Sequence, residues 1–277
     1  MGVPVAPLRP ACPAKERWDG AACVPWGDVA ARLDEGAQAV KDYRPDEALV
    51  ALDAVAAGGP LDHVSNVRLW EQRGIAHGYL QHKTDAVRSF SMLLDLDPSH
   101  LLRYDLSPHA THVFEEARVA ARARGAPALE VDWDHGLRAG APVPVEVDVI
   151  ADPAGFLARA SLFVRRRGER AWRAADLTLP PPGKYQRLIL PAIDVRADTA
   201  LEVYLRAYDR AGNEVLTWAS PERPREIALA WDPPTRWYRR WWVWAIAGSV
   251  VAGVTGGAVY ATTREPPPRV EGSVVTR

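Results

Sequence analysis

Cysteine and lysine are scarce in this chain of 277 residues, and its charges nearly cancel. There are two cysteines and four lysines, against 30 arginines, and the formal net charge is −1. A near-neutral chain exerts no global attraction on nucleic acid or acidic lipid. We therefore expect no nucleic-acid partner, and the basic run at 165–167 with Arg170 and Trp172 is interpreted as a solvated turn.

Catalytic motifs are also absent. The chain contains no H-E-x-x-H, G-x-S-x-G, G-x-x-x-x-G-K-[ST] or G-x-G-x-x-G. His109, His112, Glu115 and Glu116 would share one helix face that could hold a divalent metal, but a solvated face explains the same residues. We expect a non-enzyme without cofactor or metal site. The alternative is a metal-dependent or enzyme-associated accessory subunit, whose pocket would gather His109, His112 and a carboxylate.

The two cysteines, Cys12 and Cys23, flank a W-D-G turn in an N-terminal segment, residues 1–26. This spacing allows a small disulfide loop, which would constrain the unfolded chain by about 2–3 kcal/mol. A zinc site would need further ligands nearby, and the nearest histidine is His63. Two inert thiols are the alternative. A disulfide would indicate an oxidising compartment, although the first 13 residues lack the positive region of a complete secretory signal.

Residues 27–124 show helical periodicity: two helix pairs, then a helix that begins at Ser107 and Pro108. Four residues of the first pair recur 38 positions later, so that Gly36, Ala48, Leu52 and Pro60 correspond to Gly74, Ala86, Phe90 and Pro98. The second pair also has Trp70, and this set resembles the tetratricopeptide repeat.

The resemblance implies small residues where paired helices touch and a concave surface that binds a protein or peptide partner. Arg32, Arg68, Gln72 and His82 would lie on that surface, but nothing distinguishes them from an ordinary polar helix face.

From residue 127 to 231 the hydrophobic period changes to two. Eight short stretches rich in Val, Leu and aromatics are separated by Gly, Pro and Asp turns, as expected for an antiparallel sandwich. The pattern resembles an immunoglobulin-like or fibronectin type III-like module. The turn DRAGNEV resembles one found in such modules of bacterial envelope proteins, and Gly212 would supply its positive φ.

A linker, residues 232–240, leads into 23 uncharged residues, 241–263, and a short tail, 264–277. A helix of that length, rising ~1.5 Å per residue, matches a hydrocarbon core of about 30 Å. Headgroup-facing residues would be Trp237, Tyr238, Arg239, Arg240, Trp241 and Trp242. We therefore expect one membrane-spanning helix with lipid as a second partner.

Small residues in this span would allow close helix approach and a transmembrane homodimer, with a monomeric anchor as the alternative. They are Gly248, Ala252, Gly253, Gly256 and Gly257. Three arginines on each side leave the orientation undecided, and the disulfide favours a periplasmic bulk over a cytoplasmic tail-anchored adaptor.

The expected fold class is therefore multidomain, α then β: a tetratricopeptide-like array, a sandwich and one C-terminal transmembrane helix. The expected function is a membrane-anchored, non-enzymatic interaction or scaffold protein of the bacterial cell envelope.

Overall fold

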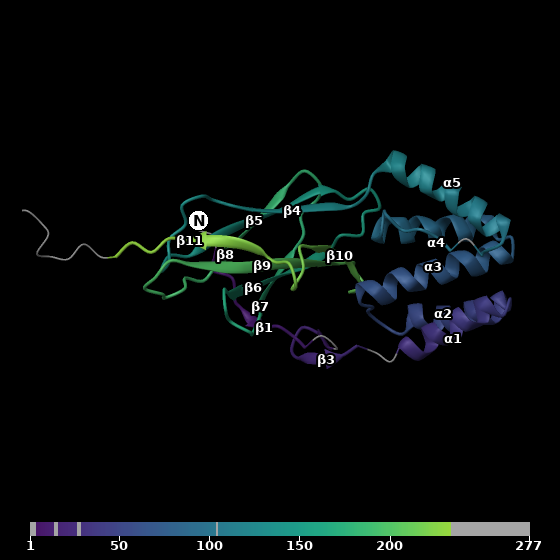
Figure 1. Ribbon diagram of the computed structural model, residues 1–277, viewed down its shortest axis with the longest axis horizontal. Coiled ribbons are helices and arrows are strands. Elements are labelled where there is room, and N and C mark those ends of the chain that lie inside the picture. Colours follow the sequence, from purple (N-terminus) through teal and green to yellow (C-terminus); the bar gives the residue numbers. More distant parts are fainter. Residues whose placement is uncertain (1–3, 14–15, 27–28, 104, 234–277) are drawn as a thin grey trace, which may run out of the picture. The chain divides into compact units, whose positions relative to one another are not determined.

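The computed structural model describes residues 4–13, 16–26, 29–103 and 105–233 (Figure 1). The chain through Trp231 forms one compact unit. Within the described ranges there are five helices: α1 (Ala30–Lys41), α2 (Pro45–Ala57), α3 (His63–Tyr79), α4 (Lys83–Leu96) and α5 (Pro108–Arg124). The N-terminal strands are β1 (Arg9–Pro10), β2 (Glu16–Trp18) and β3 (Cys23–Pro25). After the helices come β4 (Ala128–Trp133), β5 (Val143–Ala151), β6 (Arg159–Arg166), β7 (Arg173–Thr178), β8 (Tyr185–Leu190), β9 (Thr199–Tyr208), β10 (Glu214–Trp218) and β11 (Arg225–Leu229).

Two helices begin at side chains that cap their first backbone amides. Asp62 accepts a hydrogen bond from the Ser65 amide at the start of α3, and Ser107 accepts one from the Ala110 amide at the start of α5. In α5 the next residue is Pro108, which needs no amide partner in the first turn. These local signals explain why α5 begins where the sequence indicates.

The helices pack through glycines at their crossings. A Cβ at Gly36 would lie 2.8 Å from the Leu52 side chain, and one at Gly74 would lie 2.4 Å from Cε1 of Phe90. Phe90 in turn meets Phe114 of α5 edge-on, with ring centroids 5.3 Å apart. Consecutive helices contact one another in chain order (Figure 1).

The predicted tetratricopeptide-like array is wrong. The described chain has only five helices, fewer than the three pairs such an array needs, and most of its regular elements are strands in three antiparallel sheets. The recurrence of glycine at positions 36 and 74 has a local cause, because each antiparallel helix pair needs one small residue at its closest approach.

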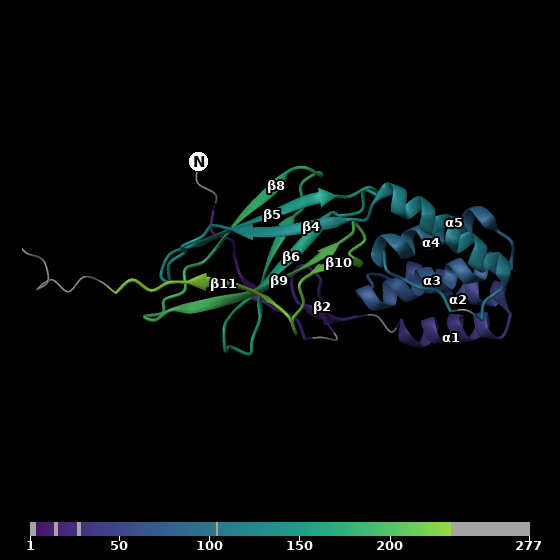
Figure 2. The ribbon, with the colours of Figure 1, turned by 45° about the horizontal axis from the view of Figure 1, so that its top comes forward.

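Two larger sheets follow the helices. One has the order β1-β7-β6-β9-β10, with β11 also paired to β9, and the other has the order β4-β5-β8. Figure 2 shows β4, β5 and β8 as one layer and β6, β9 and β10 as another. Alternate residues from both sheets fill one apolar core, which includes Val145, Val147, Leu162, Val203 and Leu205.

The N-terminal segment belongs to this β structure. Arg9 and Pro10 pair with Ala174 and Arg173 of β7, and the Ala6 amide donates to the Ile189 carbonyl of β8. Residues 4–10 therefore contact one strand of each larger sheet, β7 and β8. A strand of two residues has no hydrophobic pattern from which this pairing could be predicted.

The helices and the sheets share hydrogen bonds through the turn before β10. The Leu61 amide donates to Asn213 Oδ1, and the Glu214 amide donates to the Leu61 carbonyl, both at 2.9 Å. Asn66 of α3 donates from Nδ2 to the Glu214 carbonyl at 3.3 Å and accepts a bond from the Trp70 indole. Trp70 of α3 thus packs against both the helical core and the sheet core.

The expectation of a single-pass membrane protein is also corrected. No helix in the described ranges is long and apolar enough to cross a membrane. The predicted span 241–263, its interfacial aromatics and arginines, and its small-residue face all lie outside the described residues.

Candidate functional site

The face of the larger sheet that points away from the core has an unusual composition. Because strand side chains alternate, the residues between the core positions of β6, β7 and β9 share this outer face. Register places Ser161 opposite both Asp176 and Arg206, and Phe163 opposite Tyr204. The face therefore combines aromatic rings with charged groups.

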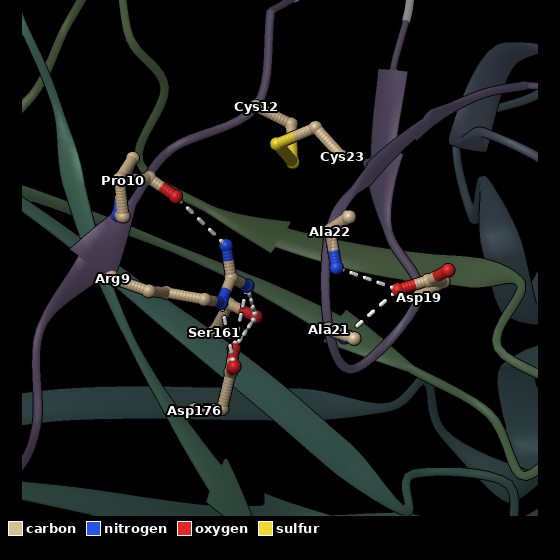
Figure 3. The surroundings of a disulfide bond; sticks show 9 residues. All are labelled: Arg9, Pro10, Cys12, Asp19, Ala21, Ala22, Cys23, Ser161 and Asp176. Atoms are coloured by element: carbon tan, nitrogen blue, oxygen red, sulfur yellow. Dashed lines mark hydrogen bonds and ion pairs between the residues drawn. A yellow bond between two sulfur atoms is a disulfide. The ribbon is translucent and has the colours of Figure 1, made fainter.

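The β2–β3 hairpin lies beside this outer face and is closed by a disulfide. Cys12 and Cys23 are bonded, with their Cα atoms 5.5 Å apart, so the predicted disulfide is confirmed. At the hairpin tip, Asp19 accepts hydrogen bonds from the amides of Ala21 and Ala22, both at 2.8 Å (Figure 3). These two bonds lower the pKa of Asp19 and direct its carboxylate into the turn.

Arg9 connects the hairpin to the sheet. Its guanidinium donates to both carboxylate oxygens of Asp176 and to the Ser161 hydroxyl, which itself donates to Asp176 at 2.6 Å (Figure 3). The guanidinium also lies 4.7 Å from the Trp18 ring of β2. Burial acts to raise the pKa of Asp176, but the bonds from Arg9 and Ser161 outweigh it and hold that pKa below its ordinary value.

Three aromatic rings pack on one another beside this network. Phe163 and Tyr204 stack with parallel planes and centroids 4.5 Å apart, and Trp172 meets Tyr204 edge-on at 4.7 Å. Burial raises the pKa of Tyr204 to about 12, so its hydroxyl stays neutral. Arg206 lies over Phe163 and Tyr204, at 5.6 and 5.7 Å from the ring centres.

Arg206 is incompletely satisfied. Its Nη1 lies 3.6 Å from Glu214 Oε2, and its Nε is buried without a hydrogen-bond partner among the described atoms. A buried guanidinium donor without a partner is costly, but because this nitrogen is shielded from solvent it is not itself open to an entering ligand.

A cavity of about 480 Å³ lies between the hairpin and the outer face; we call it the hairpin groove. Its charged lining residues are Arg9, Arg17, Arg159, Arg206, Glu16, Asp19 and Asp176. Within the described chain, Arg17 and Arg159 form no ion pair, whereas Arg9 is neutralised by Asp176. The groove therefore offers two guanidinium groups that form no ion pair, Arg17 near Asp19 and Arg159 near Asp176, and guanidinium is suited to carboxylate ligands.

The basic run beside the groove is occupied by internal ion pairs. Arg165 pairs with Glu202 at 2.5 Å and lies 4.2 Å from the Trp172 ring. Arg166 and Arg167 pair with Glu169 and Glu226. Each of these three arginines therefore has an acidic partner within the chain.

The helix-face metal set suggested by the sequence does not converge. Glu115 pairs with Arg118, and Glu116 pairs with Lys83 at 2.9 Å. In the part of the chain that the structure describes, His77, His82 and Asp85 form the one group of three side chains with metal-ligating atoms close together.

Two of the suggested helix-face recognition residues share a second cavity. Arg68 and Gln72 line a hollow of about 370 Å³ between α1, α3 and the segment before α5. Arg68 is paired with Asp34 at 2.6 Å, and neither Arg32 nor His82 lines the hollow. Its charged groups are largely paired, which makes it a weaker candidate than the hairpin groove.

The hairpin groove is not among the sites that the sequence predicts. The available signal was the alternation in ASLFVRR and LEVYLRAY, where aromatic and basic residues occupy every second position opposite an apolar core face. The contribution of Arg9 had no such signal.

No family model matches the chain, and no curated protein matches it.

Proposed function

We propose that this protein is a non-enzymatic binding protein that holds an acidic peptide segment in the hairpin groove. The observation that carries the proposal is the presence of Arg17 and Arg159, unpaired within the described chain, in one cavity of about 480 Å³. Carboxylates are the protein groups that guanidinium binds with two parallel hydrogen bonds.

The neighbouring charges favour an anionic ligand. Asp176 is neutralised by Arg9, whereas Asp19 and Glu16 keep their negative charge, and the four arginines that line the groove outnumber its three carboxylates. Since the whole chain carries a net charge of only −1, recognition would rest on this local arrangement rather than on long-range attraction.

The aromatic surface favours a peptide over a simple inorganic anion. Trp18 lines the same cavity as the arginines and is partly exposed, so its ring provides apolar area for side chains between the acidic residues. Phe163 and Tyr204 also line the cavity but are buried. An extended segment with acids at alternate positions would place carboxylates toward the arginines and the intervening residues toward solvent or the rings.

The groove is held in shape before a ligand enters. The disulfide closes the hairpin, and Arg9 joins the hairpin side to β7 through Asp176 and Trp18. A preorganised site loses less conformational entropy on binding. The disulfide also supports function in an oxidising compartment.

The serine in the groove lacks an activating base. The Ser161 hydroxyl donates to Asp176, a carboxylate whose depressed pKa makes it a weak proton acceptor, and no histidine lines the cavity within the described residues. Nucleophilic catalysis by serine needs an adjacent base. This arrangement supports binding rather than hydrolysis.

The test is a fluorescence-anisotropy titration of the full chain with a short labelled peptide that alternates glutamate and alanine. We expect saturable binding that weakens as salt is added, and no binding of the same peptide with glutamine in place of glutamate. Equal binding of both peptides would contradict the proposal. Saturable binding of a sulfated polysaccharide without binding of the acidic peptide would also contradict it.

A further inference from the structure

A second cluster of chemically reactive side chains lies at the joint between α3 and α4, away from the hairpin groove. His77 is in the last turn of α3, His82 precedes α4, and Asp85 is in the first turn of α4. The chain reverses direction between the two helices through Gln81, which has a φ of 57°. The His82 amide donates to the His77 carbonyl at 2.9 Å, which brings the two histidines together.

One ligand atom from each of the three residues lies within 4.8 Å of the other two. Zinc bonds to imidazole nitrogen and carboxylate oxygen are about 2.0–2.2 Å long, so ligands around one zinc ion lie about 3.4 Å apart. Small rotations of the two exposed side chains, His82 and Asp85, would therefore complete a three-ligand set.

Within the described chain, none of the three side chains forms a hydrogen bond or an ion pair. His77 Nδ1 is buried and has no hydrogen-bond partner among the described atoms. In the same part of the chain, the side chains of His82 and Asp85 form no hydrogen bond or ion pair. The two nearby cations are engaged elsewhere, because Lys83 pairs with Glu116 and Arg73 pairs with Asp53.

We propose that His77, His82 and Asp85 form a binding site for a divalent transition-metal ion. Zinc is the ion whose ligand preferences these residues match best. Two imidazoles and one carboxylate suit zinc, nickel or cobalt, whereas calcium and magnesium prefer all-oxygen sites. Three protein ligands leave a coordination position open to water or to a group from a partner. A bound ion would also link the end of α3 to the start of α4 and so stabilise this joint.

The site is independent of the hairpin groove, so a negative result for either leaves the other standing. The test is isothermal titration calorimetry of the full chain with zinc chloride in a buffer that does not chelate metal. We expect one zinc per chain, with at least tenfold weaker binding in both His82→Ala and Asp85→Asn. These exposed positions avoid disturbing the core, and far-ultraviolet circular dichroism would verify that both variants are folded.

The matched control is His112→Ala combined with Glu115→Gln, which removes another histidine and another carboxylate from the helices. We expect this variant to bind zinc as the unmodified protein does. Absence of zinc binding by the unmodified protein would overturn the proposal, as would unchanged affinity in His82→Ala and Asp85→Asn. Loss of binding in the His112→Ala and Glu115→Gln variant alone would locate the metal on α5 and equally refute the proposed site.

Discussion

Arg9 and Asp176, 167 positions apart, form a two-pronged ion pair: Nε donates to Oδ2 at 2.6 Å and Nη2 donates to Oδ1 at 2.7 Å. The pair fixes the N-terminal segment to β7 and stands at the wall of the hairpin groove. Its planar geometry suits guanidinium and not a lysine ammonium group.

Replacing this arginine should weaken the fold and the groove together. We expect Arg9→Ala to lower the free energy of unfolding by about 1–2 kcal/mol, since it leaves Asp176 without its charged partner. Arg9→Lys should recover only part of the loss because one of the two parallel bonds is missing. Urea titration measures the free energy of unfolding of both variants. Arg122→Ala, at an exposed position in the last turn of α5, is the control and should change stability little.

The same ion pair predicts a pH dependence. The pKa of Asp176 in the folded protein lies below its ordinary value of 3.8, so the charged carboxylate stabilises the fold at neutral pH. This contribution should disappear as the pH falls from about 4 through the folded-state pKa. The difference in unfolding free energy between the unmodified protein and Asp176→Asn should therefore shrink on acidification. A difference that stays constant from pH 7 to pH 3 would refute the assignment.

The disulfide should be complete in the native protein and important for the groove. Alkylation without reductant, followed by mass spectrometry, should label neither Cys12 nor Cys23. The double variant Cys12→Ser and Cys23→Ser should lose about 2–3 kcal/mol of stability, because the unfolded chain is no longer constrained. It should also bind the acidic peptide more weakly. Two freely labelled thiols in the native protein would contradict the structure.

Gly74 should tolerate no larger residue while Phe90 is present. A Cβ at this position would lie 2.4 Å from Cε1 of Phe90, a contact that cannot persist without displacement. We expect Gly74→Ala to cost about 1–3 kcal/mol by overpacking the α3–α4 contact. Combining it with Phe90→Leu should cost less than the sum of the two single changes. Strictly additive changes in the free energy of unfolding, measured by heat or urea, would contradict a steric clash between residue 74 and Phe90.

The sequence predicts those features of the structure that are determined by residues close together in the chain. Alternation along PVEVDVI and LEVYLRAYD corresponds to β5 and β9, and Ser107 with Pro108 begins α5, because strand faces and helix caps are set by neighbouring residues. The recurrence of Gly36 at Gly74 predicts a family repeat, and that prediction is wrong. The recurrence reflects two independent close helix contacts, with Leu52 and with Phe90.

The groove and the candidate metal site depend on contacts that no local pattern specifies. Arg9 reaches Asp176 only after the sheet has formed, and the sequence contains no periodicity that would connect them. The sequence places His82 on a polar helix face, but only the turn through Gln81 brings it beside His77. The disulfide could be predicted from the sequence, because Cys12 and Cys23 are only 11 positions apart.

The hairpin groove is tested most directly by the affinity of the acidic peptide for a double variant, Arg17→Gln with Arg159→Gln. Both arginines line the hairpin groove, and neither forms an ion pair within the described residues, so their loss should leave the fold intact. The matched control replaces two exposed arginines outside the groove, Arg122→Gln with Arg170→Gln. Anisotropy titration should show at least tenfold weaker binding, about 1.4 kcal/mol, for the groove variant and unchanged binding for the control. Equal affinities in the two variants would contradict the hairpin groove as the binding site.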